Sequence, residues 1–280
     1  MPQISFQSLK TPAKFHETHK DFFNNSSIIS QLIDKIFNRK MSFTQKAEMV
    51  VFLLGEMCVR NFREIGLLAE NGYGWGATSH LRGMFERVVT MKYVHQNPTE
   101  AISFIKYGYV QNWKAAKVLK NSIGLPPELD EKLVEMENEY KSVDKEFLID
   151  DCKTCQTKRV NYTWNKLDLI SMAKKVGGLE NVIYPAYYLP ITQNHATFSS
   201  LEKQLSQSND GKLFYDTEKE YTAGETSITY AHLLLLHVFN IQIEHFQLND
   251  LGPLIQKAYE HHLASWLPEK LDKQPNVLKS

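Results

Sequence analysis

The sequence predicts an all-α, single-domain helical bundle of about eight or nine helices. Long stretches carry apolar residues at helical three- and four-residue spacing. Helix start and stop signals bound these stretches, such as the Asn97-Pro98 pair and the Gly177-Gly178 pair. No apolar alternation is strong enough to indicate a sheet. We expect the helical domain over residues 12–267, with a flexible N-terminus at 1–11 and a flexible tail at 268–280.

The first three helices are expected in the N-terminal third of the chain. The first covers about 13–38, with a break near 24–27. The second begins at a capping box from Ser42 to Gln45 and stops at Asn71-Gly72. The third contains Ser79 to Tyr93, and the glycines just before it are expected to form the turn into it.

The fourth helix is predicted to be a central element of the bundle. Asn97 is its expected N-cap, Pro98 takes the first helical position, Glu100 follows three residues after the cap, and the helix ends near 122–124. Its large side chains form two stripes on roughly opposite sides, which predicts burial from two directions. The stripes are Ile102, Ile105, Tyr109, Trp113 and Ala116, and then Phe104, Tyr107 and Val118.

The C-terminal half is expected to be helical with irregular interruptions. A charged fifth helix from Pro127 is expected at the surface, and Pro185 and Pro190 should kink the segment after Gly178. A loop is expected at 206–222, with a small hairpin around 212–221. The remaining predicted helices are a short one at 166–176, an innermost one at 227–246 that is apolar on nearly every side, and a last one at 251–267.

Composition limits the function classes. The 280 residues are 42% hydrophobic, which is enough for a sizeable core, and 32 acidic side chains balance 32 basic ones. Zero net charge argues against a strongly basic nucleic-acid surface. The N-terminus has no apolar signal core, and polar residues interrupt the longest apolar run, 228–246. We therefore expect a soluble cytoplasmic protein that does not enter the membrane.

The sequence predicts no metal and no cofactor. Cys58 stands alone, and the pair Cys152 and Cys155 lacks a second pair or a histidine at zinc spacing, so all three are expected to be ordinary reduced thiols. Di-iron Glu-x-x-His motifs, a phosphate-binding loop and a hydrolase elbow are also missing.

The first candidate site is the pair Arg82 and Glu86. They lie four residues apart at the edge of an apolar arc, which predicts a half-buried ion pair with a tyrosine nearby. Because an unpaired charge there would be costly, partners on another helix are expected. A functional site and a purely structural clamp both remain open.

The second candidate is His195. It shares an arc with Tyr187 and Tyr188, just after irregular backbone, where a histidine could serve as a general acid or base. The alternative is a core histidine with a single partner. His232 and His237 are expected to be packing residues, and the adjacent pair at 261–262 is expected to diverge without forming a site.

Four segments together resemble a bacterial family catalogued as domain of unknown function 5677: LRGMFERVVTMKYVHQNP, FIKYGYVQNWK, NYTWNKLDLISMAKKVG and YYLPITQNHATFSS. The resemblance covers roughly 42–262 and implies that Arg82 and Glu86, Tyr107 or Tyr109, and Tyr187 or Tyr188 with His195 match the family's pattern. A more distant likeness to the all-helical HEPN superfamily implies metal-independent RNA cleavage. Active HEPN members place an arginine four to six residues before a histidine, and no arginine occurs at those positions before His195.

Two functions follow, and enzymatic activity stays open. The favoured one is a non-enzymatic interaction or regulatory module of a bacterial stress or defence locus, with a homodimer or another protein as partner. The alternative is a HEPN-like ribonuclease that binds RNA without a metal. In it, His195 is the acid–base group, Arg82 stabilises the developing charge, Glu86 orients Arg82, and Tyr107 or Tyr187 donates a hydrogen bond.

Overall fold

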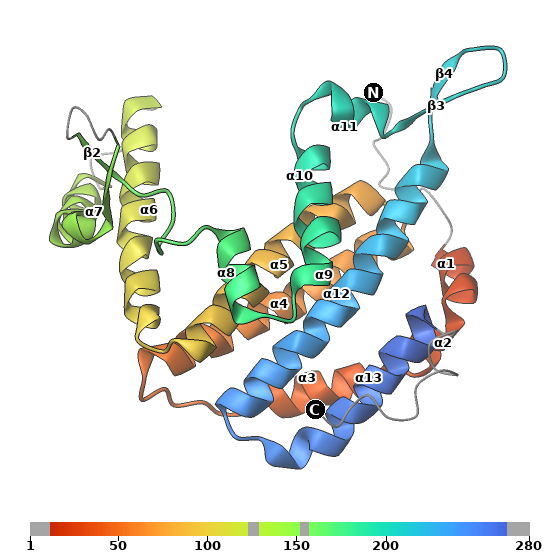
Figure 1. Ribbon diagram of the computed structural model, residues 1–280, viewed down its shortest axis with the longest axis horizontal. Coiled ribbons are helices and arrows are strands. Elements are labelled where there is room, and N and C mark those ends of the chain that lie inside the picture. Colours follow the sequence, from red (N-terminus) through yellow and green to blue (C-terminus); the bar gives the residue numbers. More distant parts are fainter. Residues whose placement is uncertain (1–11, 123–128, 152–156, 268–280) are drawn as a thin grey trace.

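The computed structural model describes residues 12–122, 129–151 and 157–267, and helices dominate it (Figure 1). The strands described are short and belong to two hairpins. The predicted all-α class is therefore confirmed. The predicted flexible ends, 1–11 and 268–280, lie outside the described residues, as do Cys152 and Cys155. The single-domain organisation stays a prediction.

Three long helices pack against one another at the centre: α4 (Lys46–Glu70), α5 (Gly74–Gln96) and α12 (Thr217–His245). The prediction that the apolar C-terminal helix is innermost is confirmed, because its side chains at 234–236 and Phe239 have no exposed surface. Glycine permits the close crossings. A Cβ at Gly74 would lie 1.8 Å from the Glu220 carbonyl oxygen of α12, and one at Gly55 would lie 2.3 Å from Gln242 Nε2.

The starts of α4 and α5 differ from the predicted ones. The Glu48 carboxylate accepts the backbone N–H of Gln45 at 3.1 Å, so the capping interaction lies three residues later than the predicted Ser42 box. Helix α5 begins at Gly74 rather than near Ser79. Gly72, with φ of 82°, makes the turn alone, and Gly74 already belongs to the helix because α12 needs the close approach there.

The N-terminal helices and the last helix cover α12 on one side. They are α1 (Pro12–Thr18), α2 (Lys20–Asn24), α3 (Ser27–Phe37) and α13 (Gly252–Trp266), which follows η4 (Asn249–Leu251). The predicted break near 24–27 is confirmed, since α2 and α3 are separate. Phe22 of α2 lies against His261 and Trp266 of α13, so ring contacts connect the N-terminal helices to the last helix.

A run of short elements follows on another side of α5: α8 (Leu169–Val176), α9 (Glu180–Ile183), the π-helical turn η3 (Tyr184–Tyr188), α10 (Leu189–Asn194) and α11 (Phe198–Glu202). Of these, α8, η3 and α10 pack on α5, and α11 packs on α10. Gly177 ends α8 with φ of 70°, as predicted. The predicted kink at Pro185 and Pro190 is confirmed as the π turn and the start of α10. This subdivision explains why the structure contains more helices than expected.

Helix α6 (Glu100–Ser122) leaves the bundle instead of lying at its centre, so that prediction is wrong. Figure 1 shows α7 (Asp130–Val143) and the first hairpin on the side of α6 that faces away from the bundle. We call α6, α7 and this hairpin together the arm. Ile102 and Val118, predicted to be buried, are exposed. The arm has its own small core of Tyr107, Val110, Val143 and Phe147. Its other elements are η2 (Asp144–Phe147), β1 (Leu148–Asp150) and β2 (Lys158–Val160), which pair antiparallel with Leu148 opposite Val160.

Asn97 does not cap α6. Its side-chain amide donates to the Tyr93 carbonyl at 2.9 Å and so satisfies the last turn of α5, and α6 begins at Glu100. The surface position predicted for the charged fifth helix is confirmed in α7, where only Leu133 and Val143 are buried.

A second antiparallel hairpin, β3 (Leu205–Gln207) with β4 (Leu213–Tyr215), precedes α12. The predicted hairpin around 212–221 is displaced, because α12 already begins at Thr217, where the Asp216 carboxylate caps it. It projects from the bundle in Figure 1. Within the described ranges, no helix is both long enough and apolar enough to cross a bilayer.

Candidate functional site

Arg82, Glu86 and Tyr187 come together as the sequence predicts. Arg82 Nε donates to Glu86 Oε1 at 2.9 Å within α5, and the guanidinium carbon lies 5.4 Å from the centre of the Tyr187 ring. Tyr187 reaches this position because the π turn η3 packs on α5, where its ring also contacts Phe85. The predicted partner from another element is thus an aromatic face rather than a second charge.

The pair is only half-buried. The side chains of Arg82 and Glu86 are 29% and 42% exposed. Burial raises the pKa of Tyr187, and the nearby Arg82 charge opposes this shift. The guanidinium therefore has a carboxylate on one side and a ring on the other, which is the geometry of a stabilising clamp.

Tyr107 lies elsewhere, in the core of the arm. Its hydroxyl donates to the Asn161 carbonyl at 2.9 Å, its ring packs against Phe147, and burial raises its pKa. It belongs to a different hydrophobic cluster from Tyr187 and the α5 side chains around Arg82. Tyr107 therefore holds the arm together rather than facing Arg82.

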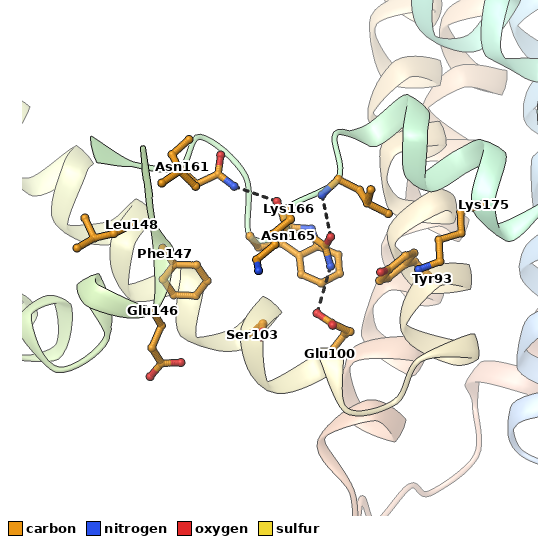
Figure 2. A pocket seen from close by; sticks show the side chains of 13 residues that line it. Tyr93, Glu100, Ser103, Glu146, Phe147, Leu148, Asn161, Asn165, Lys166 and Lys175 are labelled. Carbon is orange, nitrogen blue, oxygen red and sulfur yellow. Dashed lines mark hydrogen bonds between the residues drawn. The ribbon is translucent and has the colours of Figure 1, made fainter. Parts of the chain in front are cut away.

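The arm meets the bundle at a cavity of about 450 Å³, seen from close by in Figure 2. Asn165 is its central polar group. Its side-chain Nδ2 donates to the Glu100 carboxylate at 3.1 Å, and its side-chain Oδ1 accepts the Leu167 N–H at 2.9 Å. The Asn161 side chain donates to the backbone carbonyl of Asn165. These amides fix the loop between arm and bundle, so their hydrogen-bonding capacity is largely used by the fold.

His195 is exposed, at the C-terminal end of α10. Its backbone N–H donates to the Ile191 carbonyl at 3.3 Å. Among the described residues, no hydrogen bond or ion pair connects its ring to Arg82, Glu86 or Tyr187. The alternative of a core histidine is wrong, because α10 ends at Asn194 and His195, with extended backbone, lies at the surface.

Sequence reasoning missed a polar network on the other side of α5. Arg87 Nη1 donates to Asn61 Oδ1 at 2.7 Å, Asn61 Nδ2 donates to Glu64 Oε2 at 3.1 Å, and the same carboxylate oxygen lies 3.0 Å from His80 Nδ1. These four residues come from α4 and α5 and surround an open groove of about 390 Å³. The sequence offered one signal, because Asn61 is a polar residue on the otherwise apolar stripe of α4. The structure shows that it is buried.

A second unpredicted group is the set of histidines between α12 and α13. The ring of His232 lies 5.1 Å from that of His261 and 4.8 Å from that of His262, centre to centre. Trp266 Nε1 donates to His232 Nδ1 at 2.9 Å. The packing role predicted for His232 fits its complete burial, but the pair at 261–262 is buried with it rather than pointing to separate surroundings.

Metal sites and reactive thiols are two further kinds of functional site. Within the described residues, no three histidine, cysteine, aspartate or glutamate side chains are arranged to hold a metal ion. Burial raises the pKa of Cys58 to about 12, which keeps it a protonated thiol.

Comparison with known proteins connects the chain to one family. A family model described as a family of unknown function, DUF5677, matches residues 48–212, which is more than half of the chain. No curated protein and no solved structure matches. The matched segment runs from α4 to the tip of the second hairpin, so it includes Arg82, Glu86, Tyr107, Tyr187 and His195. The chain belongs to this family of unknown function, DUF5677.

Proposed function

We propose that this protein is a non-enzymatic interaction module that self-associates through its second hairpin. The observation that carries the proposal is a group of large apolar side chains exposed close together in the sequence. This hairpin surface consists of Phe198, Leu201, Leu213, Phe214 and Tyr215. Phe198 is 77% exposed and Leu213 is 67% exposed. Exposed apolar groups at this density typically mark a contact surface.

The hairpin surface rests on a firmly attached base. The Asp216 backbone N–H donates to the Gln204 carbonyl at 2.9 Å, and the Asp216 carboxylate caps α12 by accepting the Glu218 N–H at 3.0 Å. The Tyr215 hydroxyl donates to Glu220. The base is therefore fixed to α12 while the strands project, which supports a presented surface rather than a loosely attached loop.

A second copy of the chain is the partner we infer. Strand β4 pairs only with β3 among the described residues, so its other edge is free for a further strand, whereas the Lys219 ammonium already donates to the Leu205 carbonyl of β3. A two-fold contact would bury the same apolar set on both copies. The equal numbers of acidic and basic side chains leave no net charge to drive the copies apart.

The test is the molecular mass in solution, measured by light scattering and sedimentation over a range of micromolar concentrations. We expect wild type at twice the 32.4 kDa of one chain and a Phe198→Lys/Leu213→Lys variant at the monomer mass. Val134→Lys is the matched control, because Val134 is 58% exposed on α7, which Figure 1 shows at the opposite end of the molecule from the hairpin. Monomeric wild type, or a hairpin variant that still dimerises, would overturn the proposal.

The ribonuclease alternative has less support. It needs His195 and Arg82 around one phosphodiester, yet His195 is exposed at a helix end and Arg82 is already held by Glu86 and Tyr187. It stays a prediction, tested by RNA integrity and growth on expression of wild type, His195→Ala and Arg82→Ala. The cytoplasmic location also stays a prediction. So does the stress or defence setting, which the neighbouring genes would test.

A further inference from the structure

The groove between α4 and α5 contains charged groups that the proposed function does not use. Arg60, Glu64, His80, Gly83 and Arg87 line it, together with the buried amide of Asn61. It lies on α4 and α5, whereas the hairpin surface lies on the segment from α11 to β4. An inference about the groove is therefore independent of self-association.

Arg87 is held in place from two sides. Its Nη1 donates to Asn61 Oδ1 at 2.7 Å, and a Cβ at position 83 would lie only 2.8 Å from that same nitrogen. Gly83 thus lets the guanidinium lie against the backbone one turn earlier in α5. A side chain with this contact and a buried acceptor has little freedom to lose when a ligand binds.

The charge of Arg87 has no carboxylate partner within the described residues. Asn61 takes one of its five N–H donors, which leaves donors for a ligand. A planar guanidinium binds carboxylate or phosphate oxygens in a two-pronged manner. The natural ligand of this group is therefore an oxyanion.

His80 and Arg60 add to the same preference. Because the Glu64 carboxylate lies 3.0 Å from His80 Nδ1, we assign the proton to that nitrogen, and His80 Nε2 is then an acceptor for an O–H group of a ligand. Arg60 is exposed at the rim, one helical turn before Glu64. Two arginines against one glutamate give the groove a positive balance, although the whole chain is neutral.

We propose that the α4–α5 groove binds the phosphate group of a small molecule, with Arg87 as the principal ligand-binding residue. Arg60 supplies a second positive charge, and His80 Nε2 accepts a hydrogen bond from a phosphate O–H, a donor that a carboxylate lacks. Phosphate fits better than a carboxylate because its additional oxygens can engage all three side chains at once. Glu64 acts as a positioning residue that orients His80, and Asn61 positions Arg87.

The experiment is a titration of isotope-labelled protein with inorganic phosphate, followed through the His80 ring and Arg87 side-chain resonances and by calorimetry. Acetate at equal ionic strength is the carboxylate arm. We expect saturable shifts with phosphate and weaker ones with acetate. Arg87→Gln should weaken phosphate binding by about tenfold or more, as expected for loss of a charge-assisted hydrogen bond.

Two further variants separate geometry from charge. Gly83→Ala keeps every charge but displaces the guanidinium, so we expect it to weaken binding in the same direction as Arg87→Gln. Arg63→Gln is the matched control, since Arg63 is an exposed arginine on α4 that does not line the groove. Its binding should stay within about twofold of wild type, because exposed charges are screened. Thermal melts confirm that each variant is folded.

Four outcomes would overturn the proposal. The first is the absence of saturable shifts at His80 and Arg87. The second is equal weakening by Arg63→Gln, which would mean diffuse charge attraction. The third is unchanged binding in both Arg87→Gln and Gly83→Ala. The fourth is acetate binding as tightly as phosphate, which would replace the phosphate assignment by a carboxylate one.

Discussion

Histidines occur in two contrasting surroundings in this protein. His80 lies in the groove between α4 and α5, partly exposed, with the Glu64 carboxylate at 3.0 Å. The histidines between α12 and α13 are buried against one another and against aromatic rings, and burial lowers the pKa of His262 to about 4. His80 has a carboxylate partner and access to solvent, whereas burial keeps His232 and His262 neutral within the core. The surroundings, rather than the residue type, decide which histidine can serve a ligand.

The largest expected effect tests this contrast by acidification. Burial lowers the pKa of His237 to about 4 as well, and lowers that of His232 well below its ordinary value. The folded chain therefore binds fewer protons than the unfolded chain once the pH falls below about 6.5. Stability is complete above that pH and is lost as the pH falls towards 4. We expect a loss on the order of 1.4 kcal/mol per pH unit for each histidine that gains a proton only on unfolding.

Urea unfolding at several pH values between 7 and 4 measures this loss. The lower end of this range is the lowered pKa of His262 and His237, about 4. His262→Phe should make the pH dependence shallower, because it removes one buried proton acceptor. Phe22→Leu is the control, because it disturbs the packing beside the same histidines without removing a proton acceptor, and it should leave the slope unchanged. A slope that changes equally in both variants would mean that lost packing, and not a lost proton acceptor, changes the pH dependence.

The next effect concerns the buried amide of the groove. Asn61→Ala removes the acceptor for Arg87 and a donor to Glu64, so we expect unfolding free energy to fall by about 1–3 kcal/mol. Asn71→Ala is a suitable comparison, since Asn71 caps the end of the same helix outside the groove. Chemical denaturation measures both. An Asn61→Ala protein as stable as wild type would show that the network does not support the fold.

The smallest effects are expected at the Arg82 clamp, on the other side of α5. Because the pair is half exposed, Glu86→Ala should cost less than about 1 kcal/mol, and Arg82→Ala should cost more because it also loses the Tyr187 ring. Thermal melts of both single variants and the double variant give the coupling energy. A loss of several kcal/mol for Glu86→Ala would indicate a charge stranded by burial, as the sequence alone suggested.

Local sequence signals predicted a large part of the fold. Asn71-Gly72 ends α4 and Gly177 ends α8, because a left-handed residue after the last turn depends only on its own chain neighbours. The prolines at 185 and 190 kink the chain for the same local reason. Helix α12 was recognisable as innermost because it is apolar on nearly every side.

Of the candidate site, the sequence determined the pairing of Arg82 with Glu86, since four-residue spacing in one helix fixes that contact. Only the tertiary structure decided that Tyr187 covers Arg82, that Tyr107 lies in the arm, and that His195 is exposed. It also brought Glu64 to His80 and Asn61 to Arg87 across two helices. Such contacts depend on how each helix is rotated and where it crosses its neighbour. Those quantities are set by packing over the whole bundle and not by any short stretch of sequence.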